Sequence, residues 1–140
     1  MLIAIGGMMG ENFSILGGKL MGNKIQTDLG DIVISEELIA TLAGVAAVEC
    51  YGLVGMSTRA KLKDGIAELL GRDNLSRGVE VKQEEGELSI DLYIIVSYGT
   101  KIPEVATNVQ EKVKYMLERL TGLNVTQVNV HVQGVRVTDK

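Results

Sequence analysis

Residue types that mark the commonest functional classes are scarce in this sequence. Its 140 residues include no tryptophan, one phenylalanine, one histidine and one cysteine. A lone cysteine cannot form an intramolecular disulfide, and no spacing of cysteine and histidine predicts a metal site. Few aromatic rings are available to stack against bases or sugars. We therefore expect no metal ion or cofactor, and the cysteine content fits a reducing, intracellular compartment.

Positive charge and long apolar runs are limited as well. The net charge of -4 argues against affinity for nucleic acid over the whole surface, because neutralising phosphates supplies most non-specific binding energy. We expect no DNA partner, and an RNA partner is disfavoured. Residues 1–20 are apolar and glycine-rich, but they lack a basic n-region, and Glu11 and Asn12 interrupt the apolar run. They therefore match neither an ordinary signal peptide nor a membrane span.

Residues 1–20 are better explained as a leader, disordered or non-native, in front of a single domain over residues 21–140. Gly17 and Gly18 could be encoded by a purine-rich ribosome-binding sequence just upstream of the Met21 codon. Translation would then begin at Met21. The alternatives are a leader added to the native chain and a genuine flexible arm.

Familiar catalytic motifs are also missing, since no Walker A, GxGxxG, HExxH or nucleophile-elbow pattern occurs. We interpret His131 as a solvent-facing strand residue rather than a general base, and Cys50 as a small buried hydrophobe. The acidic hairpin region is interpreted as a solvated turn rather than as paired catalytic carboxylates; it comprises Glu84, Glu85, Glu87 and Asp91. The sequence therefore predicts a protein that is not an enzyme.

What the chain does contain is enough apolar material, 46% of its residues, for one aliphatic core. Residues 31–34 are predicted to form a short strand, and Ser35 can cap a helix that runs to Cys50. Residues 53–56 are predicted to be extended. A second, weaker helix is predicted in residues 57–72, with a glycine near its middle.

Patterns are stronger in the second half of the chain. Residues 79–98 predict a β-hairpin whose second arm alternates apolar and polar side chains. Residues 102–121 predict a helix of about 30 Å, long enough to return the chain to the start of that arm. The valine-rich strand over residues 125–137 should therefore run parallel to the arm. Its alternation slips at Gly134, which a β-bulge would explain.

These elements predict a two-layer α+β domain. Its two main helices should cover one apolar face of a mixed sheet of three or four strands. The order αββαβ is like that of KH domains or ring-building motifs.

Two surfaces are candidates for binding partners. The first is a basic patch that could contact an anionic membrane surface or an acidic partner, although a solvated insertion explains it as well; it comprises Arg59, Lys61, Lys63, Arg72 and Arg77. The second is a self-association surface on the small-residue helix and the outer sheet face, comprising Ala40, Gly44, Ala47, Tyr93 and Ile95. Close packing of that helix inside the domain is the alternative for its three small residues.

The string Gly52-Leu53-Val54-Gly55 matches the GxxG of KH domains, which clamps a nucleic-acid backbone. Its two central residues are apolar rather than basic, so the match is weak. A KH-like RNA-binding module is the alternative function.

Four segments resemble the alkaline shock protein family, the envelope stress-response proteins of Gram-positive bacteria: GDIVISEELIATLAG, CYGLVGM, YGTKIPEVATNVQEKVK and LTGLNVTQVNVHVQGV. The resemblance covers residues 21–137. It implies a cytoplasmic, non-enzymatic protein that associates with itself, and for some members a separate membrane-anchor protein as partner. From the resemblance we expect a membrane-proximal scaffold in the envelope stress response. The family has no agreed catalytic motif, so the resemblance implies no catalytic residue.

Overall fold

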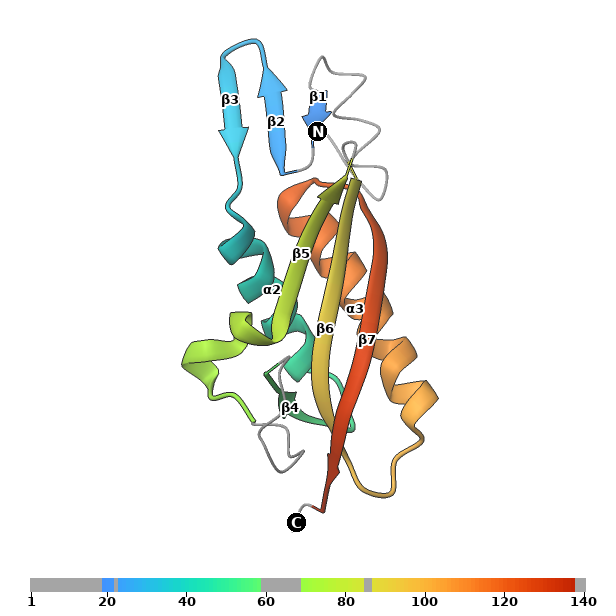
Figure 1. Cartoon of the computed structure of the whole chain (residues 1–140). Coiled ribbons are helices and arrows are strands. Elements are labelled where there is room, and N and C mark those ends of the chain that lie inside the picture. Colours follow the sequence, from blue (N-terminus) through green and yellow to red (C-terminus); the bar gives the residue numbers. More distant parts are fainter. Residues whose placement is uncertain (1–18, 22, 59–68, 85–86, 138–140) are drawn as a thin grey trace.

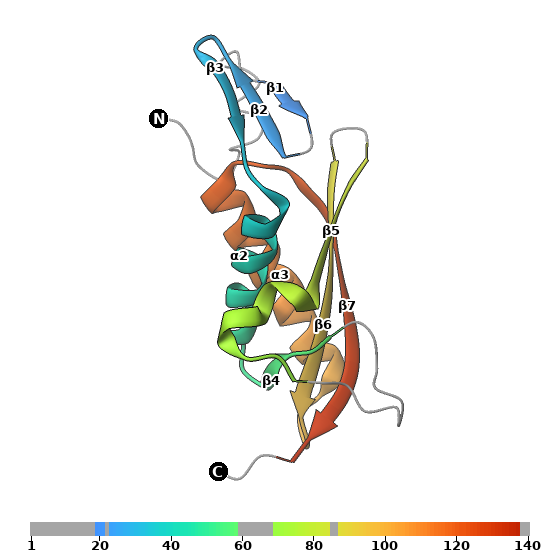
Figure 2. The same ribbon diagram turned by 60° about the vertical axis from the view of Figure 1, so that its left-hand side comes forward.

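The computed structural model describes residues 19–21, 23–58, 69–84 and 87–137. Its body has two layers, a mixed sheet and two helices that both lie on one face of that sheet (Figures 1 and 2). The predicted two-layer α+β fold is thereby confirmed. The sheet contains β4 (Leu53–Met56), β5 (Val79–Glu84), β6 (Glu87–Ser97) and β7 (Val125–Arg136), and the helices are α2 (Glu36–Val48) and α3 (Ile102–Thr121).

Strand β6 is the centre of the sheet. It pairs antiparallel with β5 through its first half and with β4 near its end, while β7 runs parallel along its other edge. The parallel direction of β7 confirms the prediction from the length of α3. The register shifts between Val132 and Gly134 opposite Ile94 and Ile95, so the predicted bulge is present.

The hydrophobic core lies between the sheet and the two helices. Alternate residues of β6 point into it, and Leu88, Ile90, Leu92, Ile94 and Val96 are all buried. Opposite them α3 buries one stripe at helical spacing, comprising Val105, Val109, Val113 and Leu117. The core is therefore formed by every second residue of β6 and by one side of α3, as the apolar spacing of the sequence predicts.

Helix α2 begins at a side-chain cap, because the Ser35 hydroxyl oxygen accepts a hydrogen bond from the Leu38 N–H at 3.0 Å. The short 3-10 helix η1 (Arg72–Gly78) packs against α2. A Cβ at Gly44 of α2 would lie 3.0 Å from the Cβ of Leu75 in η1, so a small residue permits this approach. The helix predicted in residues 57–72 falls largely outside the described residues.

A second, small antiparallel sheet precedes the body and extends beyond one end of it (Figure 2). It contains β1 (Lys19–Met21), β2 (Lys24–Thr27) and β3 (Gly30–Val33). Only β3 was expected from the sequence, and β1 begins inside the predicted leader. Gln83 of β5 links this sheet to the body, since its side chain accepts from the Asn23 N–H and donates to Glu36 of α2.

Candidate functional site

The outer face of the main sheet carries a polar cluster around Asp91, which we call the Asp91 cluster. Asp91 is only 5% exposed, although it alternates with the core-facing residues of β6 and therefore lies on the face away from the helices. Its carboxylate accepts a hydrogen bond from Asn129 Nδ2 at 2.7 Å and forms an ion pair with Lys82 Nζ at 3.0 Å. The remaining members are His131, whose Nε2 lies 3.9 Å from the carboxylate, and Tyr93, whose ring stacks on that of His131 at 4.5 Å.

The interpretation of Asp91 as part of a solvated turn was therefore wrong. The residue is in the middle of β6, where β5 and β7 each supply a side-chain partner, so its carboxylate is buried without losing all polar contacts. Burial is the largest influence on the Asp91 pKa and opposes ionisation. Hydrogen bonds from Asn129 and Lys82 outweigh it and lower the pKa below its ordinary value. The hydrogen bond with Asp91 raises the pKa of Lys82.

This cluster is suited to joining three strands rather than to catalysis. Asp91 is engaged by its neighbours, and the His131 side chain, 43% exposed, faces outward as the sequence predicts. Cys50 lies elsewhere, with its sulfur near the carbonyl oxygens of Ala46 and Asn108, and burial raises the pKa of its thiol. A raised pKa disfavours the reactive thiolate. Within the described ranges, no group of three histidine, cysteine or acidic residues is placed to hold a metal ion.

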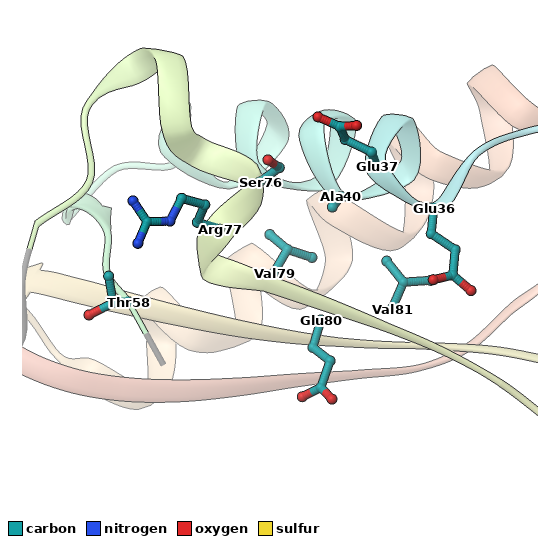
Figure 3. Close-up of a pocket in the computed structure, with 9 residues that line it drawn as sticks. All are labelled: Glu36, Glu37, Ala40, Thr58, Ser76, Arg77, Val79, Glu80 and Val81. Atoms are coloured by element: carbon teal, nitrogen blue, oxygen red, sulfur yellow. The ribbon is translucent and has the colours of Figure 1, made fainter. Parts of the chain in front are cut away.

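A pocket of about 830 Å³ lies between α2, η1 and β5 (Figure 3). Its lining combines both signs of charge, with Glu36 and Glu37 at one end and Arg77 extending toward Thr58 at the other. Glu36 is engaged, since Gln83 donates a hydrogen bond to its carboxylate at 2.8 Å. These groups do not converge on one ligand position, so the pocket does not define a reaction centre.

The predicted basic patch is only partly placed by the structure. Arg59, Lys61 and Lys63 lie outside the described residues. Arg72 begins η1, and Arg77 is exposed near its end, at the rim of the pocket. The patch remains a prediction.

The predicted self-association surface divides between the interior and the outer sheet face. Ala40, Gly44 and Ala47 are buried inside the chain, so close packing within the domain accounts for the small residues of α2. Ile95 is 1% exposed, and Tyr93 is half-buried beside His131. Of the five, Tyr93 keeps part of its side chain exposed, and self-association through this surface stays a prediction.

The GxxG string is built into the sheet rather than into a loop. Three of its residues open β4, where Gly55 pairs with Ile95 of β6. A Cβ at Gly55 would lie 2.8 Å from Cδ1 of Leu69, so this glycine permits internal packing. A KH domain needs an exposed GxxG loop to clamp a nucleic-acid backbone, and this string does not form such a loop.

Two exposed features escaped the sequence analysis. The turn and third strand of the small sheet carry apolar side chains in solvent: Leu29 is fully exposed, and Ile32 and Val33 are 47% and 66% exposed. Strand β7 is the second feature, because in the described part of the chain β6 is its sole strand partner. Alternation predicts which residues of a strand face the core but not whether its outer edge is covered, so β7 gave no such signal.

Fold and surface together define a small two-layer α+β domain with exposed apolar side chains on its small sheet and a β7 edge that no described strand covers. A family comparison matches residues 24–137 to the alkaline shock protein 23 family, described as having a cell envelope-related function. The chain belongs to this family, and the resemblance drawn from its sequence is confirmed.

Similar proteins occur in Bacillus subtilis and Streptococcus pyogenes. The uncharacterized protein YloU of Bacillus subtilis is 56% identical over 119 residues, which are 85% of this chain and 99% of that protein. Uncharacterized protein Spy1614 of Streptococcus pyogenes is 44% identical over 114 residues, 81% of this chain and 94% of the relative. A Streptococcus pyogenes homolog of the stress response regulator gls24 is 26% identical over 113 residues, 62% of its length. No solved structure matches the chain significantly.

No helix in the described ranges has the length and apolar character needed to cross a membrane.

Proposed function

We propose that this chain is a non-enzymatic, self-associating scaffold of the cell-envelope stress response. The family supports the envelope-related part of this proposal, and the relative described as a stress response regulator supports the link to stress. Self-association rests on the exposed apolar side chains of the small sheet. Association through apolar side chains requires no catalytic residue, which fits the non-enzymatic part of the proposal.

The small sheet is suited to contact another copy. Its base is fixed to the body through buried Ile25 and the hydrogen bonds of Asn23 and Gln83. Leu29 is exposed at the outer turn, and Ile32 and Val33 are exposed along β3. These three apolar side chains lie within five residues of backbone, and Ile32 and Val33 point to opposite faces of β3. Both faces of this strand therefore offer an apolar contact next to the exposed turn. Burying each one on association would contribute about 1 to 2 kcal/mol.

Sedimentation velocity of the full chain over a wide concentration range tests self-association. We expect assemblies larger than a monomer, and we expect Leu29→Ser with Val33→Ser to shift the distribution toward the monomer. Tyr51→Ser is the control, because Tyr51 is 88% exposed but lies on the body, in the turn after α2. A wild-type chain that stays monomeric at every concentration would contradict the scaffold.

We place this scaffold in the cytoplasm next to the membrane, held there by a membrane-anchor protein. The cell envelope-related description of the family supports that position. Fractionation of cells that express the tagged chain tests it. We expect the chain in the membrane fraction and release by salt if the contact is electrostatic. Recovery in the cytosolic fraction alone would contradict the membrane-proximal position.

A further inference from the structure

The outer edge of β7 is covered unevenly. At its start, side chains of α3 bind the backbone groups that face away from β6: Glu118 accepts from the Val125 N–H at 3.0 Å, and Lys114 donates to the Val125 carbonyl. Gln110 then donates to the Val128 carbonyl at 2.9 Å. Helix α3 thereby caps the first part of the edge.

The direction of the later backbone groups follows from these contacts. Because the Val128 carbonyl faces outward, the N–H and C=O groups of Val130 and Val132 face outward too, as alternate residues of a strand do. The bulge between Val132 and Gly134 then shifts the alternation. Consistent with this shift, the Arg136 carbonyl faces inward and accepts from the Tyr98 N–H at 2.8 Å.

Val130 and Val132 therefore present two N–H and two C=O groups at an open edge, with no hydrogen-bond partner on that side among the described residues. Natural sheet edges are commonly protected by charged residues, proline or a covering element. From Asn129 to Val135 this edge contains no proline and no lysine, aspartate or glutamate. Strand β5, on the opposite side of β6, is half as long and includes Glu80 and Lys82.

We propose that two copies of this chain pair antiparallel through the β7 edge, with a two-fold axis at His131. Val130 of each copy lies opposite Val132 of the other, and the two pairs exchange four backbone hydrogen bonds. This proposal rests on the self-association proposed above and names its partner, a second copy, and its contact.

This register pairs the outward-facing groups of Val130 and Val132 without displacing any contact that α3 makes with β7. One step outward, Val128 already has its carbonyl bound by Gln110, and the bulge at Gln133 ends the regular alternation. A two-fold pair is also self-complementary. The N–H and C=O groups of Val130 in each copy meet those of Val132 in the other, so both copies use the same surface. With a net charge of -4 per chain, two copies meet most easily where acidic side chains are missing, as they are along residues 125–137.

His131→Lys tests the pairing in the full chain. In a single copy the new ammonium lies near Asp91, as the imidazole does now, so the fold should persist. In the paired form two lysines would lie directly opposite each other at the axis, and like charges there disfavour strand pairing. We expect the dissociation constant from sedimentation to rise about tenfold or more. Gln127→Lys is the matched control, on the same strand and face but roughly 26 Å from its copy in this register.

Cross-linking gives a second measurement that does not depend on weakening the pair. In a Cys50→Ala background, His131→Cys places two thiols opposite each other at the axis, within reach of a disulfide. We expect a covalent dimer on mild oxidation, and none from Gln127→Cys in the same background. This readout decides the question if His131→Lys fails to fold by circular dichroism.

The outcomes separate this pairing from the scaffold itself. A wild-type chain that is monomeric at all concentrations overturns both. If the wild type associates but His131→Lys leaves its dissociation constant unchanged, or the two cysteine variants cross-link equally, the β7 pairing is overturned. The scaffold then stands on the small sheet, and the Leu29 and Val33 variants still report on it.

Discussion

Individual residues in this protein are most informative where a polar side chain is buried. The alternation of β6 placed Asp91 on its outer face, and acidic neighbours in sequence suggested a wet turn. Its actual partners, Lys82 and Asn129, come from two other strands, 9 and 38 residues away in the chain. Sequence reasoning can predict the face of such a residue, but cross-strand partners depend on register, which alternation leaves open.

Asp91→Asn should reveal this cluster through the pH dependence of stability. Since the folded pKa of Asp91 is lowered, ionisation stabilises the fold fully above the unfolded pKa of about 3.9. That stabilisation is lost as the pH falls through the lower folded pKa. We expect the variant to lose about 1 to 3 kcal/mol of unfolding free energy at neutral pH, and much less in acid.

Urea unfolding of both proteins across this pH range measures the difference. Asp31→Asn is the control, because its ion pair with Lys24 is 3.6 Å long and exposed, so its removal should change stability little. Equal losses for Asp91→Asn at neutral and acid pH would contradict an ionised, stabilising Asp91.

Gly52 is a residue where a methyl group should be costly. Its φ of +90° lies in a region that side chains disfavour, and a Cβ there would lie 2.7 Å from Cγ2 of Val105. We expect Gly52→Ala to lower the unfolding free energy by about 1 to 3 kcal/mol in a urea titration. Gly71→Ala should be nearly neutral, since the space around it is open. If Gly52→Ala leaves the unfolding free energy unchanged, the turn after α2 can relax to accommodate the methyl group.

Elements of secondary structure were predictable where their own sequence carries a period. Helix α3 and strands β6 and β7 follow from apolar spacing, and the cap at Ser35 from its residue type. Strands β1 and β2 lack such a signal, because their sequences, KLM and KIQT, show no repeated apolar spacing. These two strands form because they pair with each other and with β3, and because Asn23, between them, contacts residues outside these strands. Such contacts cannot be predicted from a local pattern.

Ser35→Ala tests the start of α2 as an element. The variant loses the hydrogen bond that its hydroxyl oxygen accepts from Leu38 N–H, and we expect a loss of about 1 kcal/mol in thermal or urea unfolding. Ser35→Asp should retain most of the wild-type stability, because a carboxylate also accepts this bond and suits a helix N-terminus. If alanine and aspartate behave alike, the cap contributes little.

At the scale of the whole molecule, the small sheet and the β7 edge lie at separate places on the fold (Figure 1). If both carry contacts, each set of substitutions alone should leave a smaller assembly, and their combination should leave a monomer. We therefore expect light scattering to rank the four proteins in that order, with effects that are close to additive. A monomer from either set alone would mean that one surface carries all of the association.

Sequence reasoning predicted the family, the two layers and the parallel return of β7, because each is encoded in a local pattern or a length. It did not predict which edges stay open, because that depends on what α3 covers after folding. Gln110 and Lys114 lie on the polar side of α3, where their spacing suggests only a wet face.

Those α3 side chains also limit how the protein can misassemble. A fully open edge of twelve residues would be a template for indiscriminate sheet growth, in vivo as in a concentrated preparation. With its start bound by a helix and its end broken by a bulge, β7 leaves a template only about three residues long. So short an edge forms too few hydrogen bonds to bind unrelated strands stably. A second copy of the chain can still pair with it reversibly.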